Sequence, residues 1–74
     1  MLIFIKSLSG NQITVDIGAS VTVEDMKAKI LAQEGIPLEH QWLIFGGKHL
    51  EDGRTLHEYG IQHDSVIYLI QVLP

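Results

Sequence analysis

The feature that most constrains the fold of this chain is a single helix signal between two stretches of strand-like sequence. Thr22 is a typical N-cap residue, and Asp25 can complete a capping box three positions later. Three apolar residues then recur at helical spacing: Val23, Met26 and Ile30. Gly35, with Pro37 just beyond it, predicts the C-terminal end of the helix. One amphipathic helix of about three turns therefore needs a sheet to cover its apolar stripe.

The sequence before the helix predicts a β-hairpin. Residues 1–6 are almost continuously apolar, and residues 13–17 alternate between apolar and polar side chains. The turn between them contains Gly10, which is placed to adopt a left-handed conformation.

The sequence after the helix predicts three further strands. Residues 42–45 indicate a short buried strand, which Gly46 and Gly47 turn back into residues 48–50. A single helical turn is expected over residues 56–59, and the last strand over residues 65–73. The predicted fold class is α+β, with the first and last strands as the central pair of a mixed sheet. The helix covers one sheet face, so apolar residues on the other face are informative.

Size, composition and charge exclude several classes of protein. The 74 residues suffice for one domain, residues 1–74, and the absence of cysteine excludes disulfides, thiol nucleophiles and thiolate zinc sites. Five scattered basic residues and a net charge of −4 argue against nucleic-acid binding. No apolar run is long enough for a membrane span, and no signal peptide is recognisable. We therefore expect a protein of the cytoplasm or nucleus.

Neither a metal site nor an active site is predicted. The histidines at positions 40, 49, 57 and 63 have spacings that fit neither a helical nor a strand ligand pair, so they indicate ordinary surface histidines. The serines lie in turns or at the ends of elements, and no nucleophile elbow is present. The expectation is a protein that is not an enzyme and has no cofactor.

Several segments of the chain carry a family resemblance. They are Met1-Leu-Ile-Phe-Ile-Lys6, Lys27-Ala-Lys29-Ile30, Glu34-Gly-Ile-Pro37, Leu43-Ile-Phe45, Gly47-Lys48, Leu50-Glu-Asp-Gly-Arg-Thr-Leu56, Tyr59 and Ile61-Gln62. Together they resemble the ubiquitin family, without gaps from Met1 to Leu73. The resemblance implies the β-grasp fold, which agrees with the predicted order of elements.

The resemblance also implies a protein-binding surface. Ubiquitin is a protein tag that receptors read through an exposed apolar patch. The matching positions here are Leu8, Ile44, Tyr68 and Ile70, with tyrosine and isoleucine where ubiquitin has histidine and valine. We expect three further residues to contribute: Trp42 by extending the patch, Gly47 by letting a partner approach closely, and His49 as a pH-sensitive contact at its rim. For Trp42 the alternative is that a partner merely covers a strand edge.

The departures from the family concern conjugation. The sequence ends at Leu73-Pro74 without the diglycine through which ubiquitin is conjugated. Trp42, Gln71, Val72 and Pro74 replace a basic, arginine-bearing segment. Lys6 and Lys48 match acceptor lysines and are candidate conjugation sites, whereas Lys27 is expected to pair with Asp52.

The expected function is therefore that of a non-conjugating interaction domain. Its expected partners are proteins: ubiquitin-binding domains, proteasomal receptors, deubiquitinases or ligases. We expect a monomer, although the exposed apolar face could also self-associate. Two alternatives remain open. One is a conjugatable modifier truncated before its diglycine, and the other is a designed or engineered variant with no native partner, because the substitutions fall in the core as well as on the surface.

Overall fold

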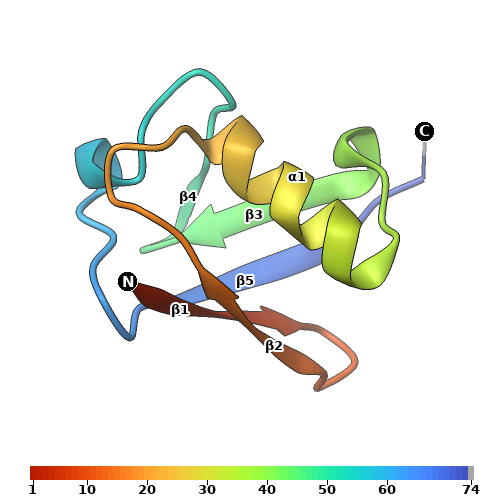
Figure 1. Cartoon of the computed structure of the whole chain (residues 1–74). Helices are drawn as coiled ribbons and strands as arrows, with labels where there is room; N and C mark the ends of the chain where they lie inside the picture. Colours follow the sequence, from red (N-terminus) through yellow and green to blue (C-terminus); the bar gives the residue numbers. More distant parts are fainter. Residues whose placement is uncertain (74) are drawn as a thin grey trace.

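The computed structural model describes residues 1–73 and consists of one helix packed across a five-stranded sheet (Figure 1). Its elements, in chain order, are β1 (Leu2–Ser7), β2 (Gln12–Asp16), α1 (Val23–Glu34), η1 (Leu38–His40), β3 (Gln41–Phe45), β4 (Lys48–His49), η2 (His57–Tyr59) and β5 (Val66–Gln71). The strand order is β2-β1-β5-β3-β4, and β1 runs parallel to β5. The predicted α+β class and the pairing of the first strand with the last are confirmed.

The ends of α1 are fixed by local hydrogen bonds that the sequence predicts. The Asp25 amide donates to Thr22 Oγ1 (3.2 Å), and the Thr22 amide donates to Asp25 Oδ2 (3.0 Å), which completes the capping box. At the other end Gly35 has a φ of 74°, and its amide donates to the Leu31 carbonyl (2.8 Å). The helix therefore begins and ends where its capping residues predict.

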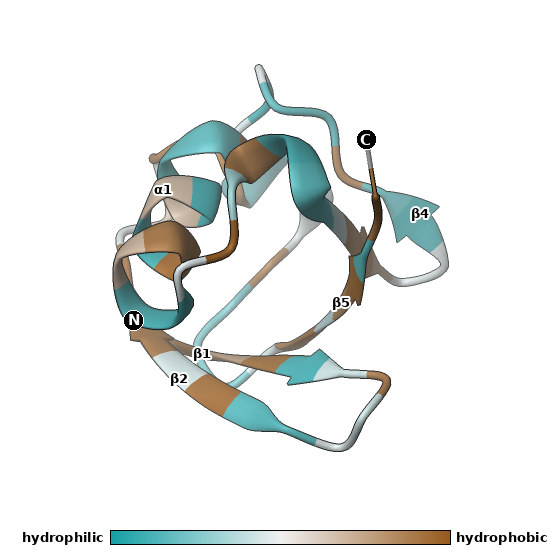
Figure 2. Ribbon diagram, turned by 90° about the vertical axis from the view of Figure 1, so that its right-hand side faces the viewer, coloured by the Kyte–Doolittle hydropathy of each residue, from teal (hydrophilic) through white to brown (hydrophobic). Residues whose placement is uncertain are grey.

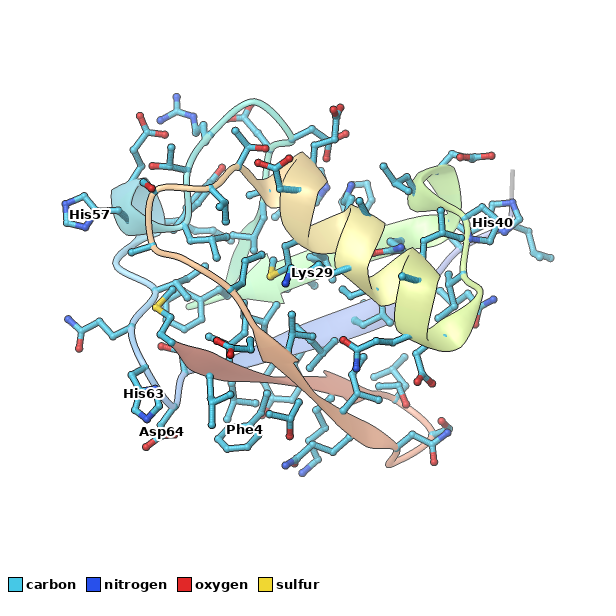
Figure 3. The ribbon with its side chains drawn as sticks, viewed as in Figure 1. Phe4, Lys29, His40, His57, His63 and Asp64 are labelled. Carbon is cyan, nitrogen blue, oxygen red and sulfur yellow. The ribbon has the colours of Figure 1, made fainter. Side chains whose placement is uncertain are left out.

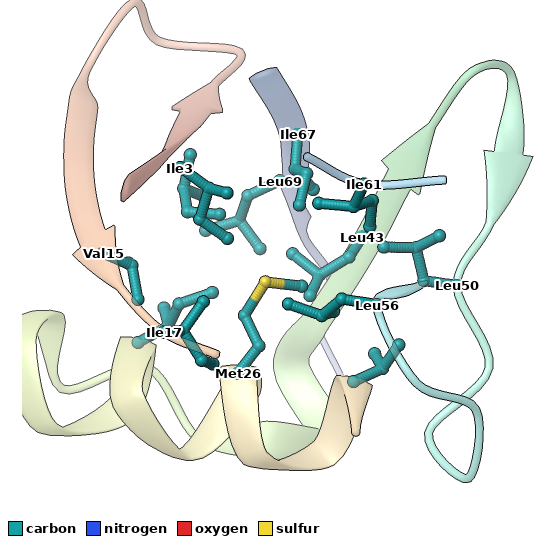
Figure 4. Packing of buried hydrophobic residues seen from close by; sticks show 13 residues of the cluster. Ile3, Val15, Ile17, Met26, Leu43, Leu50, Leu56, Ile61, Ile67 and Leu69 are labelled. Carbon is teal, nitrogen blue, oxygen red and sulfur yellow. The ribbon is translucent and has the colours of Figure 1, made fainter. Parts of the chain in front are cut away.

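The core lies between α1 and the sheet face that it covers (Figure 4). Alternate residues of β1, β2, β3 and β5 point into it, and the apolar stripe of α1 meets them around the sulfur of Met26 (Figure 4). Its buried members are Ile3, Ile5, Val15, Ile17, Val23, Met26, Ile30, Leu43, Leu50, Leu56, Ile61, Ile67 and Leu69. The remaining strand residues are left on the opposite face, which α1 does not cover.

The prediction that residues 42–45 form a short buried strand is correct for Leu43 and wrong for Trp42. Leu43 is fully buried, but its neighbour Trp42 is 42% exposed, because α1 covers only one face of the sheet and side chains of a strand alternate between faces. Phe45 and Ile44 are half-buried. The strand therefore contributes to the core and to the outer surface alike.

Two strands are shorter than predicted, and one short helix was not predicted. β4 is a hydrophilic two-residue strand at the sheet edge (Figure 2). It ends before Leu50, whose side chain is buried in the core. β5 spans residues 66–71 rather than 65–73, although the Val72 amide still donates to the His40 carbonyl (2.8 Å). The 3₁₀-helix η1 was not predicted, because three residues carry no periodic signal. Pro74 lies outside the described residues.

Candidate protein-interaction surface

The strand register brings most of the predicted binding residues together on the uncovered sheet face. β3 and β5 run antiparallel, with Ile44 opposite Tyr68 and Trp42 opposite Ile70. Ile44 also lies opposite His49 of β4. Since directly paired residues project from the same face, these five side chains from three adjacent strands form one continuous surface.

Leu8 extends this surface from the β1–β2 turn. Its side chain is 79% exposed, and it lines an open hollow of about 520 Å³ together with Ile70 and Ile36. We refer to the surface formed by Leu8, Trp42, Ile44, Tyr68 and Ile70 as the sheet patch. Large apolar side chains that remain this exposed on one face mark a surface suited to binding another protein.

Gly47 lies beside the sheet patch in the turn from β3 to β4. Gly46 and Gly47 have φ values of 60° and 78°, so both central positions of the turn are left-handed, as a two-residue hairpin requires. A Cβ atom at Gly47 would meet no other atom within 4 Å. The turn backbone therefore stays open to an approaching partner.

The rings of Trp42 and His49 stack on this face. Their centroids lie 3.7 Å apart, and their planes differ by 12°. Sequence reasoning placed His49 at the rim of the patch but did not predict the stack. The signal was present in the register, because His49 opposes Ile44 and is thereby the diagonal neighbour of Trp42. The stack gives the sheet patch an aromatic edge.

The charges on the strands that carry the patch are all basic. Lys6 opposes Tyr68 across β1 and β5, and Lys48 precedes His49 on β4; both lysines are exposed. β1, β3, β4 and β5 contain no aspartate or glutamate. The amines of Lys6 and Lys48 are therefore accessible from solution, as conjugation at a lysine requires. Lys27, in contrast, is buried and pairs with Asp52, as predicted (2.7 Å).

The other histidines lie apart from one another. His40, His57 and His63 occupy three separate places (Figure 3), and residues 1–73 contain no group of three or more potential metal ligands. His63 has a local role that the sequence did not predict: its Nδ1 accepts a hydrogen bond from the Leu2 amide (2.9 Å). Within the same residues, no helix combines the length and apolar character needed to cross a membrane.

Comparison with known proteins identifies the family to which this fold and surface belong. The family model described as the ubiquitin family matches residues 3–73. The chain belongs to the ubiquitin family. The sheet packed on one helix is accordingly a β-grasp fold, as the resemblance implied.

Relatives of this ubiquitin-like domain match over almost its full length. Ubiquitin-like protein NEDD8 of Dictyostelium discoideum is 40% identical over 73 residues, which are 99% of this chain and 95% of the relative. NEDD8-like protein RUB3 of Arabidopsis thaliana is 37% identical over 99% of this chain and 94% of its own length. Ubiquilin of Dictyostelium discoideum is 36% identical over 90% of this chain, but the match covers only 13% of ubiquilin. The same domain thus occurs both as a small protein and as one part of a longer one.

Proposed function

We propose that this ubiquitin-like domain is a non-conjugating interaction module that binds protein partners through the sheet patch. The observation that carries the proposal is the register that places Ile44, Tyr68, Trp42 and Ile70 on one uncovered sheet face beside the exposed Leu8. The expected partners are ubiquitin-binding domains, proteasomal receptors, deubiquitinases or ligases. Helices with an apolar stripe are well suited to such a surface, because their side chains can occupy the shallow relief between strands.

The residues near the end of β5 support the non-conjugating part of this proposal. Gln71 and Val72 stand where ubiquitin carries part of a basic segment, and Trp42 replaces a further basic residue. Enzymes that conjugate ubiquitin are expected to bind those basic side chains, so replacing them should weaken the binding of such enzymes. Noncovalent binding through the sheet patch requires none of them.

The test is a titration with a ubiquitin-binding helical peptide, followed by NMR on the labelled protein. Amide shifts should concentrate around Ile44, Leu8 and Ile70. Ile44→Ala should weaken binding about tenfold, as expected for a central interface residue. Leu8→Ala should also weaken it, and because this side chain is 79% exposed in a turn, the fold will be unaffected.

Leu31→Ala is the matched control. Leu31 is 40% exposed on α1, which packs on the other face of the sheet, away from the sheet patch. Its truncation should leave the affinity unchanged. Shifts that avoid Ile44, or an Ile44→Ala variant that binds as well as the unaltered protein, would contradict the proposal.

A conjugated modifier is the second candidate function, and the 40% identity to a NEDD8 protein over 95% of that relative favours it. This function requires Gly-Gly within a few residues after Pro74 in the parent reading frame. The reading frame, followed by a thioester assay with an activating enzyme, decides between the two. A frame without the diglycine eliminates conjugation.

A further inference from the structure

A second concave site lies at the edge of the sheet. It adjoins the sheet patch at Trp42 and extends toward α1 and η1. It is an open hollow of about 520 Å³ lined by residues of the N-terminal half of α1, η1, the start of β3, β4 and the segment that follows β4. The residues that matter for its chemistry are Glu24, Lys27, Glu39, Gln41, Trp42 and Asp52. We call it the edge hollow.

The edge hollow has an excess of negative charge. It contains three carboxylates, those of Glu24, Glu39 and Asp52, and one ammonium group, that of Lys27. The ammonium is already matched, because Lys27 Nζ lies 2.7 Å from Asp52 Oδ1. Glu24 and Glu39 are exposed and form no ion pair within residues 1–73. Two carboxylates are thus left to attract a cation.

One wall of the edge hollow is aromatic. Trp42 and His49 both line it, and their stacking holds the indole in place. An indole beside free carboxylates is a favourable environment for a cationic side chain, which interacts with the π face and the negative charges together. The basic residues of β1 and β4, Lys6 and Lys48, are not among those that line this hollow.

Gln41 adds a polar group that lacks a partner. The residue is only 3% exposed and contributes to the lining of the hollow. Its Nε2 donates to the carbonyls of Lys27 and Ile36, both at 2.9 Å, whereas its Oε1 is buried without a hydrogen-bond donor. A buried acceptor without a donor is costly, so a residue of the hollow's lining carries an unsatisfied polar group.

We infer that the edge hollow binds the guanidinium group of an arginine side chain supplied by a protein partner. Arginine fits better than lysine, because its planar group stacks on an indole while its several N–H donors reach carboxylates on different sides. The inference deepens the proposed function and rests on it in one respect. Trp42 belongs to both surfaces, so a partner on the sheet patch can extend an arginine around the sheet edge.

The test uses a blocked Ala-Arg-Ala tripeptide and the same peptide with citrulline, which is nearly isosteric with arginine but uncharged. NMR follows the Trp42 indole N–H and the Gln41 side-chain amide, which report directly on the hollow. The arginine peptide should shift both signals, and citrulline should shift neither. The Glu24→Gln/Glu39→Gln double variant should bind the arginine peptide about five- to tenfold more weakly, since two exposed charge contacts are lost.

Glu34→Gln is the matched control, because Glu34 is an exposed carboxylate at the other end of α1, outside the edge hollow. It should bind the arginine peptide like the unaltered protein. Equal shifts with the arginine and citrulline peptides, or undiminished binding by the double variant, would overturn the inference. Ile44→Ala separates the two proposals: it should weaken binding of the helical peptide about tenfold and leave binding of the arginine peptide unchanged.

Discussion

The Lys27 ammonium group and the Asp52 carboxylate form an ion pair in which only one partner is buried. Nζ lies 2.7 Å from Oδ1, and the side chains are 7% and 51% exposed. The pair connects α1 to the segment after β4, where the Glu24 amide also donates to the Asp52 carbonyl (3.2 Å). The charge that needs compensation is therefore the buried one on the helix.

This asymmetry predicts unequal effects of removing the two charges. Asp52→Asn leaves a buried ammonium without a counterion and should lower the free energy of unfolding by about 1–2 kcal/mol, less than for a fully buried pair because Asp52 is half exposed. Lys27→Met in the Asp52→Asn background keeps the apolar stem and should recover most of that loss. Urea unfolding measures both variants; a double variant as unstable as Asp52→Asn would contradict the explanation.

Adjacent residues of β3 should respond very differently to truncation. Leu43 is fully buried, so Leu43→Ala should cost about 3 kcal/mol through lost burial and the cavity that remains. Trp42→Ala removes a larger side chain from the outer face and should cost about 1 kcal/mol or less, mainly through loss of the stack on His49. Thermal or urea unfolding compares the two. Similar losses would mean that the alternation along β3 does not govern its stability.

The sequence predicted the features that depend on local chemistry. The capping residues Thr22 and Gly35 define the ends of α1, and the glycine pair at positions 46 and 47 defines the β3–β4 turn. The resemblance to the ubiquitin family supplied the residues of the sheet patch. The stack of Trp42 on His49 was not predicted, although the β3–β4 pairing makes the two residues diagonal neighbours. The edge hollow was not predicted because it depends on how β3 and the segment after β4 lie against α1 and η1. Such contacts between distant segments leave no periodic trace in the sequence.

Gly47 should be intolerant of a side chain for backbone reasons alone. Its φ of 78° is strained for other residues, although a Cβ atom would meet nothing within 4 Å. Gly47→Ala should therefore cost about 1 kcal/mol. Gly53→Ala is the control, because Gly53 has the same free space without a positive φ and should be neutral or slightly stabilising. Unfolding curves that show equal effects at the two positions would rule out backbone strain as the cause.

The last prediction concerns the hydrogen bond from the Leu2 amide to His63 Nδ1 (2.9 Å), which holds the start of β1. The next residue reinforces this contact, since the Asp64 amide donates to the Leu2 carbonyl (2.7 Å). His63→Ala removes the acceptor at an exposed site where water can replace it, so the cost should be about 0.5–1 kcal/mol. Hydrogen exchange of the Leu2 amide should accelerate, while that of the Ile5 amide should change only by the loss of global stability.

His57→Ala is the control. His57 is an exposed histidine whose side chain makes no hydrogen bond within residues 1–73, so its removal should leave exchange of the Leu2 amide unchanged. Unaltered Leu2 exchange in His63→Ala would show that this hydrogen bond does not hold the start of β1.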